Sequence, residues 1–201
     1  MKTKLGAAMV AFLLMFVSAA YAGVYVTPDT PQTVGGSAAI AEGVGNSPTV
    51  EFMWVLPDDI DGEPGTQLEI IPSGERNDIY ACLVVGDVDS RDSITDVFVD
   101  VYHPDESFKY QVHARHLDHL TSDLTEIEDC LSGAVAAGLI SEADRTEIEY
   151  NIMSQPNWYM YKVYLPMYYH QPAGLYAALG YAVDDTSRIS AAYEGAFEWV
   201  P

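Results

Sequence analysis

Residues 79–114 constrain the fold of this chain most strongly, because they carry the alternation of half-buried β-strands. β-Branched and aromatic residues dominate both Ile79–Val85 and Thr95–Tyr102, as is typical of strands. In the second run three valines share one face: Val97, Val99 and Val101. The other face carries Asp96, Phe98, Asp100 and Tyr102. This period of two predicts one buried face and one solvent-exposed face. The turn at residues 103–107 predicts a hairpin into a further strand at Phe108–Val112.

The pattern changes to helical spacing in the middle of the chain. Apolar residues recur at intervals of three and four: Leu124, Ile127, Leu131 and Val135. Thr121 or Ser122 is the expected N-cap, and Gly138 is the expected C-terminal stop. Ser141 begins a capping box for a second helix. The sequence therefore predicts an α-helical hairpin, at about residues 121–155, inserted into a strand-rich chain.

Strand patterns resume with the aromatic run WYMYKVYLPMYYH at residues 158–170. One face of this strand would carry Tyr159, Tyr161, Val163, Leu165, Met167 and Tyr169. The other would carry Trp158, Met160, Lys162, Tyr164 and Tyr168. Since neither face is simply polar, we expect both to be covered, one by an opposite sheet and one by the helical hairpin or a neighbouring subunit. Two further strands follow, Leu175–Val183 and Ile189–Val200, separated by an Asp-rich turn.

Residues 1–22 have the pattern of a secretory signal peptide. The segment has a positive start, an apolar centre and a small-x-small cleavage site: Lys2 and Lys4, Ala7–Val17, and Ala20-Tyr21-Ala22. The apolar run is shorter than the roughly 20 residues of a membrane span. An uncleaved anchor, or a pilin-type leader cut after Gly6, is the alternative. We expect an exported chain whose remaining residues, 23–201, form a single domain in the extracellular space or cell envelope, with no membrane span.

The chain is strongly acidic, with 30 Asp and Glu residues against nine Lys and Arg. Its formal net charge of −21 becomes −23 once Lys2 and Lys4 are removed with the signal peptide. Such a surface repels nucleic acid and anionic lipid. It suits cations, basic partners or a salty medium, and a solvated surface adapted to salt explains it as well as a metal store does.

Several short strands separated by turn signals at intervals of roughly ten residues indicate a β-sandwich. The segment PAGLYAALGYAVDD, residues 172–185, looks like the penultimate strand of immunoglobulin-like and fibronectin-like domains. The resemblance implies that Tyr176 forms a tyrosine corner, with its hydroxyl bonded to nearby backbone. The segment 84–110 resembles paired strands of immunoglobulin-like modules in secreted archaeal surface proteins. The expected fold is a mainly β, immunoglobulin-like antiparallel β-sandwich, and the helical hairpin departs from that pattern.

The chain has two cysteines, Cys82 and Cys130. An even count in an exported protein permits a disulfide. A bridge within the chain would close a loop of nearly fifty residues. Two buried thiols, or bridges between subunits, are the alternatives, since Cys82 lies in an apolar strand where free cysteine also packs well. The immunoglobulin pairing of second and sixth strands is not available, because Cys130 falls in the inserted helix.

Two acidic turns place oxygen ligands at short intervals, as Ca²⁺ requires. The first carries Asp58, Asp59, Asp61 and Glu63, and the second carries Asp87, Asp89 and Asp92. Neither is an EF-hand, and Pro64 stands where that motif needs glycine. Calcium is the cofactor that these turns suggest. The alternative is two ordinary acidic turns at the wet end of a sandwich.

The aromatic run supplies a candidate assembly or ligand surface: Trp158, Tyr159, Tyr161, Tyr164, Tyr168 and Tyr169. Its rings could stack on carbohydrate, mediate self-association, or simply form core. Three histidines are spaced by three: His113, His116 and His119. On a helical turn the first two would share a face, a spacing compatible with zinc or copper, and the alternative is a polar junction between strand and helix.

The sequence lacks the common signatures of catalysis. There is no G-x-S-x-G, no H-E-x-x-H and no glycine-rich phosphate loop. We therefore expect a non-enzymatic structural subunit, or an accessory, of a cell-envelope assembly such as a sheath or surface layer. Its partners would be further copies of itself or other envelope proteins. A secreted carbohydrate- or calcium-binding module is the alternative.

Overall fold

The computed structural model describes residues 46–60, 65–70, 74–76, 78–120, 123–154 and 158–201. The predicted signal peptide lies outside these ranges. The described strands are β1 (Thr49–Leu56), β2 (Thr66–Glu69), β3 (Glu75–Arg76), β4 (Tyr80–Gly86), β5 (Ile94–Tyr102), β6 (Phe108–His113), β7 (Arg115–Leu117), β8 (Trp158–Tyr164), β9 (Met167–Tyr168), β10 (Gly174–Asp184) and β11 (Tyr193–Val200). The described helices are η1 (Arg91–Ser93), α2 (Leu124–Ala136) and α3 (Glu142–Met153).

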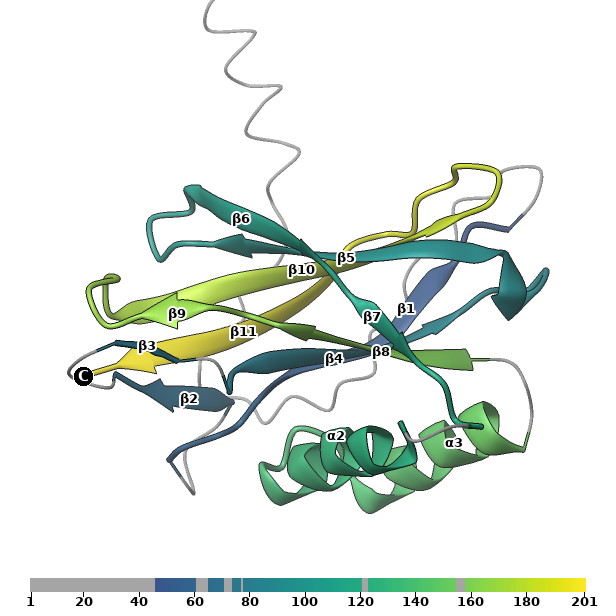
Figure 1. The fold of residues 1–201 in the computed structure, drawn as a ribbon, viewed down its shortest axis with the longest axis horizontal. Helices are drawn as coiled ribbons and strands as arrows, with labels where there is room; N and C mark the ends of the chain where they lie inside the picture. The colour runs from purple at the N-terminus through teal and green to yellow at the C-terminus, as the bar shows by residue number, and fades with distance from the viewer. Residues whose placement is uncertain (1–45, 61–64, 71–73, 77, 121–122, 155–157) are drawn as a thin grey trace, which may run out of the picture. The chain divides into compact units, whose positions relative to one another are not determined.

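The strands form two main sheets that face each other, with the two α-helices on the far side of one of them (Figure 1). The four-stranded sheet has the order β1-β4-β8-β7, and the five-stranded sheet has the order β2-β11-β10-β5-β6. Every pair is antiparallel except β11 with β2, which is parallel. β3 and β9 form a separate short ribbon. The expected antiparallel sandwich is thus confirmed.

The strand order is that of an immunoglobulin-like domain. In that fold one sheet carries strands A, B, E and D, and the other is built on G, F and C. Here β1, β4, β8 and β7 correspond to strands A, B, E and D, and β11, β10, β5 and β6 correspond to strands G, F, C and C′. The first strand is divided, because β1 pairs with β4 whereas β2 pairs with β11 in the opposite sheet.

The predicted tyrosine corner is confirmed at the start of β10. The Tyr176 hydroxyl donates a hydrogen bond of 2.8 Å to the carbonyl oxygen of Pro172. Its ring is fully buried and stacks on Phe197, with ring centroids 5.3 Å apart and planes 9° apart. This contact ties the turn before β10 to the core between the sheets.

The core between the sheets consists of the inward faces of alternating strands. β5 contributes the predicted valines, all fully buried, and β8 contributes the face that begins with Tyr161. The core residues of these two strands are Val97, Val99, Val101, Tyr161 and Val163. The alternation in the sequence therefore predicted the inward face of β5 correctly, and it sorted the residues of β8 into the two faces that the structure shows.

The helical hairpin covers the outer face of the four-stranded sheet, as Figure 1 shows. A second apolar core fills the space between them, and it includes Trp54, Cys82, Val84, Met160, Ile127, Leu131 and Ile148. β8 is therefore buried on both faces, which confirms the interpretation of its two-faced apolar pattern.

The helix ends follow the predicted chemistry in part. Ser141 and Asp144 form the predicted capping box of α3, in which each side chain bonds the backbone N–H of the other residue. Gly138 ends the first helix with a φ of 69°, a conformation that favours glycine. The N-cap of α2 is Asp123, without a side-chain capping bond. The candidates Thr121 and Ser122 lie outside the described residues.

Candidate functional site

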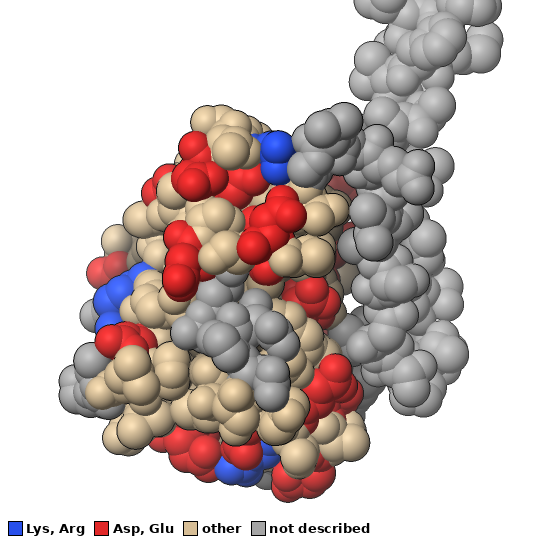
Figure 2. Space-filling view, turned by 90° about the vertical axis from the view of Figure 1, so that its right-hand side faces the viewer, with Lys and Arg blue, Asp and Glu red and all other residues tan. Residues whose placement is uncertain are grey.

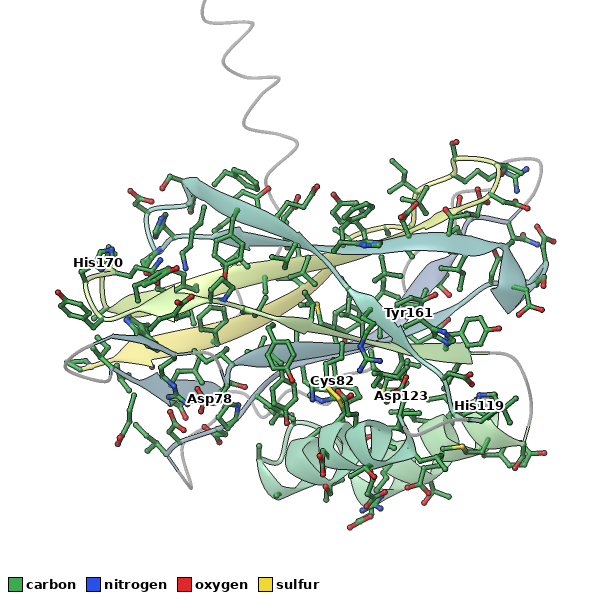
Figure 3. All side chains as sticks on the ribbon, viewed as in Figure 1. Asp78, Cys82, His119, Asp123, Tyr161 and His170 are labelled. Carbon is green, nitrogen blue, oxygen red and sulfur yellow. A yellow bond between two sulfur atoms is a disulfide. The ribbon has the colours of Figure 1, made fainter. Side chains whose placement is uncertain are left out.

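A disulfide joins Cys82 on β4 to Cys130 on α2, with a Cα–Cα distance of 6.2 Å. Both residues are fully buried. Figure 3 shows the bridge between the sheet and the helices, on the side away from the opposite sheet. The Trp54 indole N–H donates to the carbonyl oxygen of Cys130 beside it, at 3.1 Å. The disulfide thus attaches the helical insertion to strand B and does not link the two sheets.

The first acidic turn binds the protein's own donors. Asp58 Oδ1 accepts from the backbone N–H of Gln67 at 2.9 Å, and Asp59 Oδ2 accepts from that of Glu69 at 2.8 Å. Asp59 also forms an ion pair with the buried guanidinium of Arg76. Asp61 and Glu63 lie outside the described residues. The two described carboxylates therefore hold the crossing from β1 to β2 together.

Arg76 is the centre of this arrangement. Its guanidinium also contacts the Asp78 carboxylate, with Nη2–Oδ2 at 2.6 Å and Nε–Oδ1 at 2.9 Å. The hydrogen bond from Arg76 holds the pKa of Asp78 below its ordinary value, although partial burial opposes the shift. A buried guanidinium requires such partners, since an uncompensated charge inside a protein is costly.

The second acidic turn is also bonded internally. Asp87 accepts from the backbone N–H of Asp89 and from the Ser93 hydroxyl, both at 2.8 Å. Asp89 accepts from the backbone and the side-chain amide of Asn46, both at 3.1 Å. Figure 2 shows carboxylates spread over this end of the molecule, with few basic residues. Within the described ranges, no three His, Cys, Asp or Glu side chains are grouped as metal ligands.

The predicted aromatic surface is divided by the pleat of β8 and by the chain that follows it. Tyr161 is only 6% exposed, so it belongs to the core. Trp158 is half-buried under the helices and packs edge-on against Phe52, with centroids 6.0 Å apart. The candidate surface residues therefore lie in different environments, because β8 is an inner strand between β4 and β7, and core, one of the alternatives for this run, holds for Tyr161. Three of the rings do reach solvent: Tyr164, Tyr168 and Tyr169.

The charged residues that hold the hairpin to the sheet were not identified from the sequence. Lys162 is buried on β8, where its Nζ lies 3.2 Å from Glu126 Oε2 on α2 and 4.1 Å from the centroid of the Tyr80 ring. Arg115 on β7 pairs with the same carboxylate group at 2.5 Å and with Asp123 at 2.9 Å. Lys162 stands between aromatic residues in the sequence, and this was the one available signal of its burial.

A cleft of about 510 Å³ opens where the chain passes from one sheet to the other. It brings together features that the sequence presented separately. Asp92 comes from the second acidic turn, and His113 and His116 come from the histidine triplet. The remaining lining residues come from the aromatic run and from nearby strand ends: Tyr159, Tyr161, Ile94, Thr95, Ala114 and Arg115.

The histidines do not converge on a common point. His113 Nε2 lies 3.1 Å from Asp96 Oδ1 on the neighbouring strand. His116 packs on two tyrosine rings, with centroids 4.2 Å from Tyr159 and 5.4 Å from Tyr161. His119 follows β7 and is not among the residues lining the cleft. The spacing of three in the sequence does not become a shared face, because the first two histidines belong to different sheets.

The outer face of the five-stranded sheet is the second notable surface. It carries apolar and aromatic side chains from three neighbouring strands: Phe98 and Tyr102 on β5, Phe108 on β6, and Leu175, Ala177, Leu179 and Tyr181 on β10. Ring centroids lie 5.5 Å apart for Phe98 and Tyr181 and 5.7 Å apart for Tyr102 and Phe108. No described helix or strand packs on this face (Figure 1). The alternation in the sequence predicted that Phe98 and Tyr102 lie on the solvent-exposed face of this strand.

Among the described residues, no helix is long and apolar enough to cross a membrane. No protein-family model matches the chain, and no curated protein matches it. A solved structure titled BspA_C_mut is similar over 78% of this chain and 52% of its own chain, with 11% sequence identity and a TM-score of 0.29. This chain therefore spans about half the length of that one. The immunoglobulin-like fold is assigned from the strand order and the tyrosine corner described above, not from this similarity.

Proposed function

We propose that this chain is an exported, non-enzymatic structural subunit or accessory of a cell-envelope assembly, such as a sheath or surface layer of the archaeal type. It acts by self-association. The signal-peptide pattern supports export, and the resemblance of residues 84–110 to archaeal surface modules supports the location. One structural observation carries the proposal, namely that the outer face of the five-stranded sheet exposes apolar side chains on which no described helix or strand packs.

That face differs from its counterpart on the other sheet. The helical hairpin covers the outer face of the four-stranded sheet, and the disulfide secures it there. The five-stranded sheet instead leaves Leu175 63% exposed and Phe108 57% exposed. Contiguous exposed apolar side chains on a folded domain mark an interaction surface. A second copy of the chain, presenting the same apolar face, is the occupant we propose.

Charge sets the conditions under which two copies can meet. Carboxylates flank the apolar centre, since Asp100 and Glu194 both lie opposite Leu179 and Glu198 lies opposite Leu175. Two chains of residues 23–201, each with a net charge of −23 once Lys2 and Lys4 are removed from the −21 of the whole sequence, also repel each other at long range. Dissolved ions screen exposed charges over about 8 Å at physiological ionic strength. Association should therefore strengthen as salt or divalent cations are added.

Sedimentation velocity of residues 23–201 over a range of protein and NaCl concentrations, with and without Ca²⁺, tests the proposal. We expect larger species to form as salt rises. The double variant Leu175→Glu/Phe108→Glu places two charges on the apolar face, so it should require at least about tenfold more protein to associate. The matched control Val88→Glu/Leu120→Glu adds the same charge at positions that are 82% and 80% exposed, away from this face.

The control variant should associate as the unmodified chain does. A chain that stays monomeric under every condition contradicts the proposal. So does a Leu175→Glu/Phe108→Glu variant that associates as readily as the control, because the face would then play no part.

A further inference from the structure

The cleft between β5 and β8 has the composition of a ligand site, and it does not lie on the face assigned to self-association. We infer that it binds a neutral sugar residue. The inference rests on three properties of the lining side chains: the shape imposed by the fold, the mixture of apolar and hydrogen-bonding groups, and the local charge.

The cleft is a consequence of how the chain changes sheets. The backbone N–H of Ala114 still bonds the carbonyl oxygen of Val97 on β5, at 2.8 Å, whereas Arg115 already pairs with Lys162 on β8. The chain therefore passes from the five-stranded sheet to the four-stranded sheet between Ala114 and Arg115, along the edge of the sandwich. A volume of about 510 Å³ remains beside it, which is within the range of small-molecule sites.

The apolar part of the lining is largely aromatic. His116 and Tyr159 supply its half-buried rings, with centroids 4.2 Å apart, and the core residue Tyr161, only 6% exposed, contributes a small area beside His116. Burial raises the pKa of the Tyr161 phenol, which keeps it neutral. Ile94 and Ala114 complete this part of the lining. Such a surface can pack against the C–H face of a sugar ring.

The polar part of the lining offers both donors and acceptors. The Tyr159 hydroxyl donates to the Asp92 carboxylate, so the 3₁₀ turn before β5 is linked to β8 through these two side chains. Thr95 contributes a hydroxyl and His113 an imidazole. A sugar presents apolar C–H groups on its faces and hydroxyl groups at its edges, so it matches a lining of this mixed kind. Each of these groups already has one protein partner, and a wholly apolar ligand would remove water from the remaining acceptor positions of Asp92 and Thr95 without replacing it.

The local charge disfavours an anionic ligand. Four carboxylates lie at or near the cleft: Asp92, Asp96, Asp123 and Glu126. The nearby Arg115 guanidinium already contacts two of them, at 2.9 Å from Asp123 and 2.5 Å from Glu126. Phosphates, sulfates and uronic acids would meet a net negative field. A neutral sugar meets neither this repulsion nor the desolvation of a charge of its own.

Saturation-transfer NMR on residues 23–201 provides the test. The probes are the methyl glycosides of glucose, galactose, mannose and N-acetylglucosamine, with glucuronic acid and choline as charged comparisons. We expect transfer to at least one neutral glycoside and none to glucuronic acid. Tyr159→Ala should weaken binding at least about tenfold, and Tyr159→Phe, which keeps the ring and loses the hydroxyl, by a smaller factor.

The control is Tyr164→Ala, which removes a 56% exposed ring from the same strand outside the cleft and should leave binding unchanged. Three results overturn the inference. These are no transfer to any neutral glycoside, transfer to choline alone, and transfer that survives both Tyr159→Ala and His116→Ala in variants whose circular dichroism shows a folded chain. Sedimentation of the same variants keeps this result separate from that for self-association.

Discussion

Gly180 on β10 packs so closely against the Leu83 side chain from β4 that residue 180 has no room for a side chain of its own. A Cβ placed on Gly180 would lie 2.6 Å from Leu83 Cδ2 and 2.7 Å from Met53 Sδ. Leu83 is fully buried and Met53 is nearly so, which leaves neither side chain room to withdraw. The distance between the sheets at this point therefore depends on the absence of a side chain.

Gly180→Ala should lower the free energy of unfolding by about 1–3 kcal/mol, the usual cost of forcing a methyl group into a packed core. Gly195, on the adjacent β11, is the matched control, since a Cβ there would have its nearest neighbour at 3.6 Å. Gly195→Ala should be neutral or slightly stabilising, because it reduces the entropy of the unfolded chain. Urea denaturation of both variants checks the prediction, and equal effects would contradict it.

Removing the disulfide should lower the free energy of unfolding by about 4 kcal/mol, the loop-closure entropy expected for its sequence separation of 48 residues. The double variant Cys82→Ala/Cys130→Ala tests this by denaturant unfolding. The unmodified chain unfolded in the presence of a reductant should show the same loss. An unchanged midpoint in both experiments would mean that the hairpin is held by its apolar contacts alone.

Tyr176→Phe should lower the free energy of unfolding by about 1–2 kcal/mol. The variant keeps the stack on Phe197 and loses only the hydrogen bond to the Pro172 carbonyl, leaving that acceptor unsatisfied at the corner. Tyr169→Phe, at a residue that is 51% exposed, is the control and should have no measurable effect. Thermal unfolding followed by circular dichroism compares the two, and a Tyr176→Phe chain as stable as the control would refute the role of the corner.

Lys109→Met should stabilise the protein at neutral pH. Burial lowers the pKa of the Lys109 amine to about 8, and its Nζ lies 4.5 Å from the Tyr110 ring centroid and 3.4 Å from the Pro166 carbonyl oxygen. No carboxylate of the described residues pairs with it. Since the unfolded chain binds this proton more tightly, the unmodified protein gains stability as pH rises from about 8 to about 10.5.

The advantage of Lys109→Met should therefore be largest near pH 7, at about 1 kcal/mol after allowing for partial exposure, and should shrink toward pH 10. Lys162→Met provides the contrast, because that lysine is paired with Glu126 and its loss should destabilise the protein. Unfolding free energies of the three chains at pH 7, 8.5 and 10 check both signs. A pH-independent difference between Lys109→Met and the unmodified chain would contradict the titration of Lys109.

The alternation of apolar and polar residues predicted the layers better than it predicted the sites. It identified the inward valines of β5 and the two buried faces of β8, because a period of two is a property of each strand alone. It could not show that Tyr161 is core whereas Tyr164, on the same strand, is exposed. That difference depends on where the helices and the opposite sheet end, and it places the candidate aromatic residues in different environments.

The acidic turns also show that a local sequence pattern does not identify the partners of a side chain. The spacing of Asp58 and Asp59 suits a calcium ligand set as well as it suits a bonded turn. Only the structure brings Arg76 to Asp59, and only the structure brings Tyr159 to Asp92. In both cases the partner lies 17 or more residues away in the chain, so no local pattern could indicate it.

The sequence by itself determined the class of the fold, the inserted helical hairpin and the tyrosine corner at Tyr176, since each depends on residues that are close together in the chain. The tertiary structure alone decided that the hairpin covers the four-stranded sheet, whereas no described helix packs on the outer face of the five-stranded sheet. It also decided that Cys82 faces Cys130 on the hairpin, and that Asp92, His116 and Tyr159 line one cleft. These relationships depend on how the sheets and helices pack, and the contacts join residues that are far apart in the sequence. Burial of apolar area stabilises such contacts whatever the number of residues between them.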